Sequence, residues 1–513
     1  MLPQEIVIKL KRKMAYLDKK LYKFEKYLKR FLYFCSKRGI SENKLIYFFL
    51  LSMMSIYFIV FSMIPISQHN AFATFGFDLG LVDQQIWLVS QGKEPFSTIR
   101  GLHTFGDHVP VIVFFIAPLY WFWADVKAIL ILQTVVIALG AIPIYWLARD
   151  KLKKKWISLI FPLVYFLYPA VEYINLWHFH FEALAISFIL FAFYYMTKEK
   201  YILFGLFSFL AIACKETVSI VILFLGVYIF MKHSRKLGII TALASMIWLI
   251  VCMSIILPYF NEFGSPHLIY RYGAFGSTFE ELAANLILKP DLVLSTIFTP
   301  FNMKYLFELL APVGFISLLS PPTLAISVPT MITHLLSGHE PQRTIYFQYT
   351  AAIIPFIFIS LIYGSARIIK GIKSKYFLVI FLLIITLLSN HYLSSSPISI
   401  NPVYYLMPDN VNTLNNAISI IPEDANVSAT YLLVPHLSHR ERIYEFPNPF
   451  KSEYWGIKGE NPHDPGIIEY IILNKGLMSE EWKRIAQSLL DDGNYTIVLD
   501  EERVLLLRRS DIV

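Results

Sequence analysis

Charged residues are scarce in this chain of 513 residues: Lys, Arg, Asp and Glu make up 16% of it, against about 25% in soluble globular proteins. Hydrophobic residues reach 56%, and the mean hydropathy is +0.54. This composition excludes a soluble globular protein and predicts a polytopic membrane protein.

Cysteine is also rare. The three cysteines, Cys35, Cys214 and Cys252, lie in a basic N-terminal segment and in apolar segments. Their positions predict neither a disulfide framework nor a thiolate metal site. The chain also lacks an evident internal repeat or low-complexity tract, which argues against a repeat architecture.

Long runs without charge predict membrane-spanning helices. The first, residues 45–65, has 21 residues, enough for a helix to cross roughly 30 Å of hydrocarbon. Ten later segments complete a predicted α-helical bundle of about eleven spans: 128–148, 156–172, 182–197, 201–214, 217–231, 237–258, 304–319, 322–337, 346–366 and 376–393.

Basic residues are concentrated near the N-terminus. Residues 1–44 hold 13 Lys and Arg and four Asp and Glu, although the whole chain has a formal charge of only +8. Apolar residues recur among the lysines at helical spacing, which predicts an amphipathic tail on anionic lipid rather than a nucleic-acid-binding segment. Short basic loops mark the cytoplasmic side. We therefore expect a cytoplasmic N-terminus, with the basic loops at 149–155, 197–200, 232–236 and 367–375 on the same side.

This orientation predicts a long first external loop, residues 66–127. The loop at 149–155 can return to the cytoplasm only if the apolar segment from Val109 to Ala124 does not cross. That segment has 16 residues, including Pro110 and Pro118, and would be about 24 Å long as a helix. Because it is shorter than a usual span, we expect it to be interfacial or re-entrant.

Residues 394–513 change character and predict a small external α/β domain after a membrane domain at 45–393. Expected elements are a helix at 408–422, strands at 426–431 and 468–474, a helix between Ser479 and Gly493, and a hairpin at 495–500 and 503–509.

Acidic residues follow the first predicted span, where charges are costly unless they are needed. Asp78 is the candidate general base. Asp83 is a candidate for substrate binding, but on a helix it would point about 140° away from Asp78. Asp107 and His108 precede the interfacial segment and are further catalytic candidates. Asp78, Asp107 and His108 are also candidate ligands for a divalent ion, Mg²⁺ or Mn²⁺.

Other polar clusters are predicted to fall on the same external side. His178 and Glu182 would share a helix face at a spacing of four, and arginine binds phosphate well through its forked guanidinium. The candidates for substrate binding are therefore His178, His180, Glu182, Lys215, Glu216, Tyr270, Arg271, Tyr272, His339 and Arg343.

Several motifs resemble a family of prokaryotic membrane proteins designated domain of unknown function twenty seventy-nine. The resemblance covers residues from about Phe75 to Arg509. It rests on FDLGLVDQQIW, GDHVPVIVFFIAPLYW, FHFEALAI, CKETVSIV, YRYGAFGS, SPPTLAISVPTMITHLLS and VPHLSHRERIY.

More distantly, the chain is similar to polytopic glycosyltransferases of GT-C type that use polyprenyl-phosphate sugars. That resemblance implies a cytoplasmic N-terminus and an essential acid soon after the first span, a position that Asp78 matches. Unlike many members, this chain has no two adjacent acids there, and GDHVP only loosely matches their His-Pro element.

We therefore expect a multi-pass cell-membrane protein that transfers a sugar from a polyprenyl-phosphate donor to an external acceptor. A carboxylate would accept or orient the acceptor proton, while cations or a metal ion would stabilise the departing phosphate. The alternatives are a transporter or flippase for a lipid-linked or anionic solute, and a non-catalytic assembly protein.

Overall fold

The computed structural model describes Tyr27, Arg30, Tyr33, Phe34, Lys37 and residues 40–261, 269–371, 375–453 and 464–512. The predicted amphipathic helix of the basic tail lies almost entirely outside these residues. The membrane part consists of α2 (Glu42–Asn70), α6 (Val126–Leu139), α7 (Ala141–Leu152), α8 (Ile160–Phe166), α9 (Pro169–Leu176), α10 (Phe181–Thr197), α11 (Tyr201–Cys214), α12 (Val218–Lys232), α13 (Arg235–Val251), α14 (Leu257–Phe260), α15 (Phe279–Leu288), α16 (Pro290–Ile297), α17 (Pro300–Leu310), α18 (Pro321–Leu324), α19 (Val328–Leu336), α20 (Ile354–Gly371) and α21 (Tyr376–Leu393).

Fewer helices reach spanning length than the sequence predicted. Within the described ranges, five are long and apolar enough to cross a membrane, or six if the bent pair α8 and α9 forms one span. The helices α10, α11 and α12 are apolar but shorter. The predicted spans 304–319 and 322–337 are broken into short pieces, which include α17, α18 and α19. Pro312 and Pro329 lie within these two segments and Pro321 lies between them, and proline interrupts helical hydrogen bonding.

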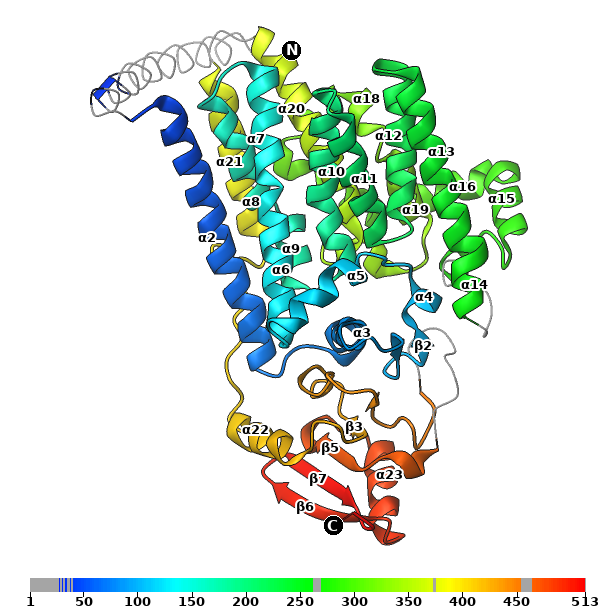
Figure 1. Cartoon of the computed structure of the whole chain (residues 1–513). Helices are drawn as coiled ribbons and strands as arrows, with labels where there is room; N and C mark the ends of the chain where they lie inside the picture. The colour runs from blue at the N-terminus through cyan, green and yellow to red at the C-terminus, as the bar shows by residue number, and fades with distance from the viewer. Residues whose placement is uncertain are drawn as a thin grey trace.

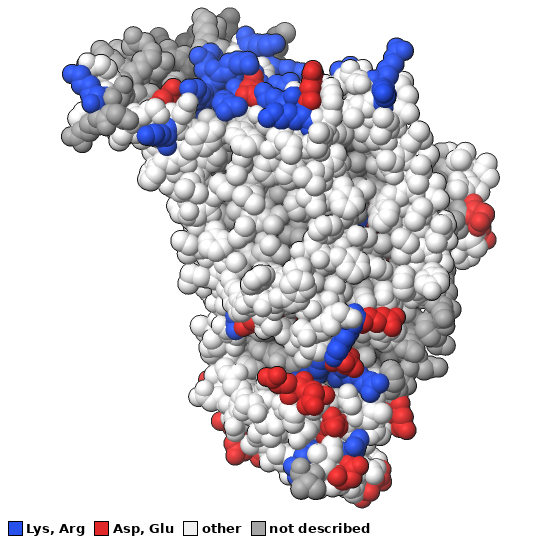
Figure 2. Space-filling view, viewed as in Figure 1, with Lys and Arg blue, Asp and Glu red and all other residues white. Residues whose placement is uncertain are grey.

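The two ends of the molecule differ in charge. Figure 2 shows Lys and Arg gathered at the end where α2 begins, a nearly uncharged band below, and most of the Asp and Glu around the C-terminal domain. Figure 1 places the far ends of α7, α10, α12 and α20, which carry the basic loops, at the same end as the start of α2. The basic loops therefore share one side of the apolar band, as predicted, and the C-terminal domain lies on the other.

The first loop folds under the bundle. It contains a π-helical turn (Gly76–Gly80), α3 (Leu81–Ser90), the paired strands β1 (Phe96–Ser97) and β2 (Leu102–His103), α4 (Thr104–Asp107), α5 (Val113–Ile116) and a 3₁₀ helix (Ala117–Trp121). The segment from Val109 to Ala124 thus forms two short helical pieces rather than a spanning helix.

The C-terminal domain has one mixed five-stranded sheet, in the order β4-β3-β5-β7-β6. Its elements are α22 (Val411–Ile420), β3 (Val427–Ala429), β4 (Ile443–Glu445), β5 (Tyr470–Asn474), α23 (Glu480–Asp491), β6 (Tyr495–Glu501) and β7 (Val504–Arg509). The predicted helices, strands and final hairpin are confirmed within a few residues, and the Ser479 hydroxyl caps α23 by accepting from the Trp482 amide at 3.1 Å. The sequence prediction missed β4, which pairs in parallel with β3.

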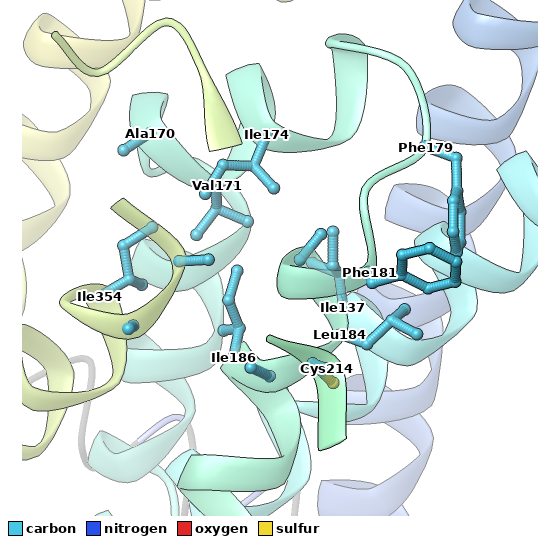
Figure 3. Close-up of a cluster of buried hydrophobic side chains, with 14 of the residues drawn as sticks. Ile137, Ala170, Val171, Ile174, Phe179, Phe181, Leu184, Ile186, Cys214 and Ile354 are labelled. Atoms are coloured by element: carbon cyan, nitrogen blue, oxygen red, sulfur yellow. The ribbon is translucent and has the colours of Figure 1, made fainter. Parts of the chain in front are cut away.

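The core of the bundle is apolar and tightly interleaved. Figure 3 shows Ile137, Ile174, Ile186 and Ile354 converging from α6, α9, α10 and α20. Cys214 lies among these side chains and is buried, so this cysteine acts as a small apolar core residue.

The first loop and the C-terminal domain are in direct contact. The Gly76 amide donates to the Tyr431 carbonyl at 2.8 Å, and the rings of Phe75 and Tyr431 stack with centroids 5.9 Å apart. A Cβ atom on Gly76 would lie only 2.8 Å from the Cβ of Val434. The turn that carries Asp78 therefore requires glycine at this point because the C-terminal domain presses against it.

We predict that Gly76→Ala weakens the junction between the loop and the C-terminal domain. The added methyl would overlap Val434 and the Tyr431 carbonyl, and overpacking of this kind costs about 1–3 kcal/mol. Thermal unfolding and protease sensitivity of the C-terminal domain measure the effect. Gly205→Ala is the matched control because a Cβ there meets nothing within 4 Å; equal behaviour of the two variants would contradict the prediction.

Candidate functional site

Asp78 lies in the π-helical turn, opposite the entrance to α10. The Nε2 atom of His180 is 3.8 Å from Asp78 Oδ1, and His180 Nδ1 lies 3.1 Å from the Trp177 carbonyl. If Nδ1 donates to that carbonyl, Nε2 carries a proton facing Asp78 only when the imidazole is charged. Burial works to raise the pKa of Asp78, but the hydrogen bond and charge of His180 outweigh it and lower the pKa below its usual value.

His178 does not share a helix face with Glu182, contrary to the prediction. It precedes α10, in a left-handed backbone conformation with φ of 48°. The side chain is completely buried against the rings of Phe75 and Trp177, and neither ring nitrogen has a hydrogen-bond partner among the described residues. Burial is the main reason that the pKa of His178 falls to about 4, so this imidazole is neutral near pH 7.

A buried ion pair and a contact between a glutamate and a histidine lie beside this turn. Lys215 Nζ is 2.9 Å from Glu182 Oε2, and His108 Nδ1 is 3.1 Å from Glu216 Oε1. Glu216 also accepts from the Val109 amide at 3.0 Å. The pairs join the start of α10, the connection from α11 to α12, and the residue that follows α4, so segments far apart in the sequence meet here.

The electrostatics of these pairs favour the charged forms. Burial alone would raise the pKa of Glu216, but His108, Lys215 and the Val109 amide lower it to about 2. Burial likewise works to lower the pKa of Lys215, and the carboxylates of Glu182 and Glu216 raise it above its usual value.

Two cavities meet at these residues. A small one of about 80 Å³ is lined by Asp107, His108, His180, Glu182 and Lys215, among others. A larger one of about 280 Å³ is also lined by His108, Glu182 and Lys215, and extends between α12, α15 and α19. Its wall combines cationic and apolar side chains, including Lys215, Arg271, Val218, Ile220, Leu282, Leu286, Ile332 and Leu336.

Arg271 is a second cationic side chain that lines the larger cavity. One guanidinium nitrogen lies 3.3 Å from Gln342 Oε1, whereas Nε is buried without a hydrogen-bond partner among the described residues. Tyr349, which the sequence analysis missed, lies between the cations: its ring centroid is 5.6 Å from Arg271 Cζ and 5.7 Å from Lys215 Nζ. Its hydroxyl is 3.3 Å from His339 Nε2. No charge or motif marked this tyrosine in the sequence.

Of three other predicted residues, only one lines the larger cavity. Tyr272 lines it and donates to the Thr333 carbonyl at 3.1 Å. Tyr270 is exposed. Arg343 is not among the lining residues of either cavity; it lies over the Phe301 ring and 3.4 Å from Asn302 Oδ1.

Asp83 lies apart from Asp78, in agreement with the predicted divergence, and holds the C-terminal domain. It is fully buried, accepts from the hydroxyls of Tyr120 and Ser438, and lies 3.0 Å from His439 Nε2. These contacts place Asp83 at the junction between the first loop and the C-terminal domain. It lines neither of the two cavities.

The predicted metal site is not formed. Within the described ranges, no three His, Cys, Asp or Glu side chains come together as ligands for an ion. Asp78 faces His180, His108 is bonded to Glu216, and Asp107 Oδ2 lies 3.9 Å from Arg100 Nε. Each predicted ligand thus has a different neighbour.

A further carboxyl group comes from the C-terminal domain. Glu445 ends β4 opposite Ala429 of β3, two residues before Tyr431. Burial, the charge of Asp78 and that of Glu453 raise the pKa of Glu445 to about 7. Sequence analysis could not find this residue, because its proximity to Asp78 depends on how the C-terminal domain packs against the first loop.

The fold and site together define a multi-helix membrane protein with a charged, partly apolar cavity near the end that carries its C-terminal domain. The chain belongs to the family of predicted membrane proteins DUF2079, whose model matches residues 68–506. Among solved structures, it is similar to ArnT from Cupriavidus metallidurans bound to undecaprenyl phosphate, with 9% identity, a TM-score of 0.48, and coverage of 90% of this chain and 97% of that one. A comparison with curated proteins found no match.

We predict that Glu216 makes stability fall in acid. Its pKa in the folded protein, about 2, lies below the ordinary 4.5, so its contribution is complete above pH 4.5 and is lost as the pH falls towards 2. The loss should reach roughly 3 kcal/mol. Glu216→Gln should lower the unfolding temperature at pH 7 and flatten its dependence on pH in this window. Glu280→Gln, at an exposed site, is the control; identical pH curves for wild type and Glu216→Gln would contradict the prediction.

We also predict that Asp78→Asn lowers the pKa of Glu445, because it removes one of the charges that raise it. Infrared titration of the protonated carboxyl band, assigned with Glu445→Gln, measures the change. Asp291→Asn, at an exposed position on α16, should leave the pKa of Glu445 at about 7. An unchanged value in Asp78→Asn would show that the two carboxyl groups do not interact.

Proposed function

We propose that this protein is a membrane glycosyltransferase that takes its sugar from a polyprenyl-phosphate donor. The observation that carries the proposal is the larger cavity, where Lys215 and Arg271 stand among aliphatic side chains of α12, α15 and α19. A lipid phosphate has the same two properties, an anionic head and an apolar chain. Arginine and lysine supply charge-assisted hydrogen bonds to phosphate, and the aliphatic walls accept hydrocarbon.

Asp78 is the proposed general base. It is not among the lining residues of either cavity, but it lies beside His180, which lines the small cavity. The small cavity shares His108, Glu182 and Lys215 with the larger one. The acceptor hydroxyl would approach Asp78, which orients it and takes its proton as the hydroxyl oxygen forms a bond to the sugar. The bond between the sugar and the phosphate oxygen breaks, and the electron pair leaves with the phosphate, where Lys215 and Arg271 offset its charge.

In the proposed reaction, Asp78 acts on the acceptor, and Lys215 and Arg271 act on the donor phosphate. In the proposed orientation, the basic loops face the cytoplasm, and the site and the C-terminal domain face the external side. The bilayer supplies the donor from that side. A transporter or flippase and a non-catalytic assembly protein remain the competing functions, and neither requires the carboxylate of Asp78 for group transfer.

We predict that Asp78→Asn lowers sugar transfer by about 10²–10⁴-fold, the usual contribution of a general acid or base. Transfer from polyprenyl-phosphate sugars in reconstituted membranes measures the loss, with donor binding as a second readout. Donor binding should survive because Asp78 acts on the acceptor. Undiminished transfer by Asp78→Asn would eliminate the proposed base, and absence of transfer by wild type with all donors tried would argue against the enzyme.

We predict that Arg271→Gln weakens donor binding much more than Arg343→Gln. Both changes remove one guanidinium, but only Arg271 lines the larger cavity. Loss of a charge-assisted hydrogen bond costs about 1.5–3 kcal/mol, or roughly 10- to 150-fold in affinity. Equilibrium binding of polyprenyl phosphate in detergent measures the difference. Equal losses in the two variants would contradict the assignment of this cavity to phosphate.

A further inference from the structure

In the segment that connects α21 to α22, serine side chains are buried and large apolar side chains are exposed. Ser394, Ser396 and Ser399 are buried, whereas Ile398 and Ile400 are about half exposed. Further along, the exposed fraction is 69% for Tyr404, 86% for Leu406 and 54% for Met407. A segment surrounded by water would turn its isoleucines inward and its serines outward.

Three consecutive serines at the start of the segment contact polar groups of the bundle. Ser394 donates to Glu172 of α9, Ser395 Oγ lies 3.1 Å from the Tyr173 hydroxyl, and Ser396 Oγ donates to Asn390 Oδ1 at 2.8 Å. Asn390 in turn donates to both oxygens of Glu172, at 2.8 and 2.7 Å. These bonds satisfy a buried carboxyl group, which would otherwise be costly, and they fix which side of the segment faces outward.

The position of the segment matches the edge of the apolar band. From Tyr376, the start of α21, to Pro408 there is no Lys, Arg, Asp or Glu. In Figure 1 the gold trace between α21 and α22 descends along the outside of the bundle at the height of the lower part of α2. At a similar height lies α5, and the residues soon after it, Trp121, Phe122 and Trp123, are also exposed.

We infer that residues 394–407 form a membrane strap, which lies on the bundle at the boundary between hydrocarbon and lipid head groups and presents its apolar side chains to lipid. Tyrosine is enriched at this depth because its ring is apolar and its hydroxyl is polar. The prediction that a soluble domain begins at residue 394 is thereby revised: the domain begins after the strap.

The backbone of the strap fits this depth. Irregular chain is not tolerated in the hydrocarbon interior because its polar groups lack partners there. Here Ile400 and Val403 donate to the carbonyls of His391 and Ser395 at 2.9 and 3.0 Å. Pro397 and Pro402 have no amide hydrogen to satisfy. The remaining carbonyls can be hydrated at the head-group level.

Accessibility of spin labels tests the strap. In full-length protein with Cys35, Cys214 and Cys252 replaced, single cysteines at Ile398 and Leu406 would carry a nitroxide in phosphatidylcholine and phosphatidylglycerol vesicles. Ile497 of β6 is the matched control, since it is also an exposed apolar residue but belongs to the distal strand of the sheet. Oxygen, which partitions into lipid, should relax the labels at 398 and 406 several-fold more than a water-soluble nickel chelate, and the order should reverse at 497.

Two results would overturn the strap. Preferential relaxation by the nickel chelate at 398 and 406 would place them in water, and low accessibility to both reagents would mean that protein, including a second copy of this chain, covers them. If the cysteine variants do not fold, wild-type protein in the same vesicles can be treated with an apolar photoactivated carbene. Labelling should then concentrate on residues 394–407 relative to β6, and equal labelling would refute the proposal. Neither measurement depends on sugar transfer.

Discussion

The cost of removing charges from water governs where this chain can place its polar side chains. On the face shown in Figure 2, most Lys, Arg, Asp and Glu gather at the two ends of the apolar band. Inside the protein, Lys215 is paired with Glu182, and Glu216 lies 3.1 Å from His108 Nδ1. Breaking such a buried pair by removing one partner leaves an uncompensated charge, which is strongly destabilising. The pairs therefore do two things at once: they hold α10, α11 and α12 in register with the first loop, and they keep a lysine charged at the wall of an apolar cavity.

The second constraint is that the site is assembled from two parts. Asp78 stands on a turn whose glycine is pressed by Val434 and bonded to the Tyr431 carbonyl. On the other side of the same loop, Asp83 is held by Tyr120 and by Ser438 and His439 of the C-terminal domain. The two acids of this short segment thus have different partners. Asp83 contacts the C-terminal domain, and Asp78 faces His180. A motion of the domain would move both, so the position of Asp78 is coupled to the docking of the C-terminal sheet.

Much of this could be predicted from local sequence. Apolar runs identified α2, α20 and α21, and cap and turn residues placed α23 and the final hairpin, because these features depend on neighbours in the chain. Of the predicted residues, His180 and Lys215 line the small cavity, Lys215 and Arg271 line the larger one, and Asp78 lies beside His180. Local sequence patterns did not predict the features that depend on tertiary contacts. The His178 conformation and the partners of Asp107 and His108 follow from packing between distant segments, as do the positions of Tyr349 and Glu445.

The proposed strap would move the predicted boundary of the membrane domain from residue 394 to a point after residue 407. Turn residues and hydroxyls usually face water. In this chain the serines face inward because Glu172 and Asn390 need hydrogen-bond partners inside the bundle. Because these polar groups form their hydrogen bonds inside the bundle, the isoleucines, Tyr404 and Leu406 face outward. The direction of a side chain is thus set by where its polar neighbours find partners, and a buried carboxyl group on α9 determines which surface of a distant segment meets the lipid.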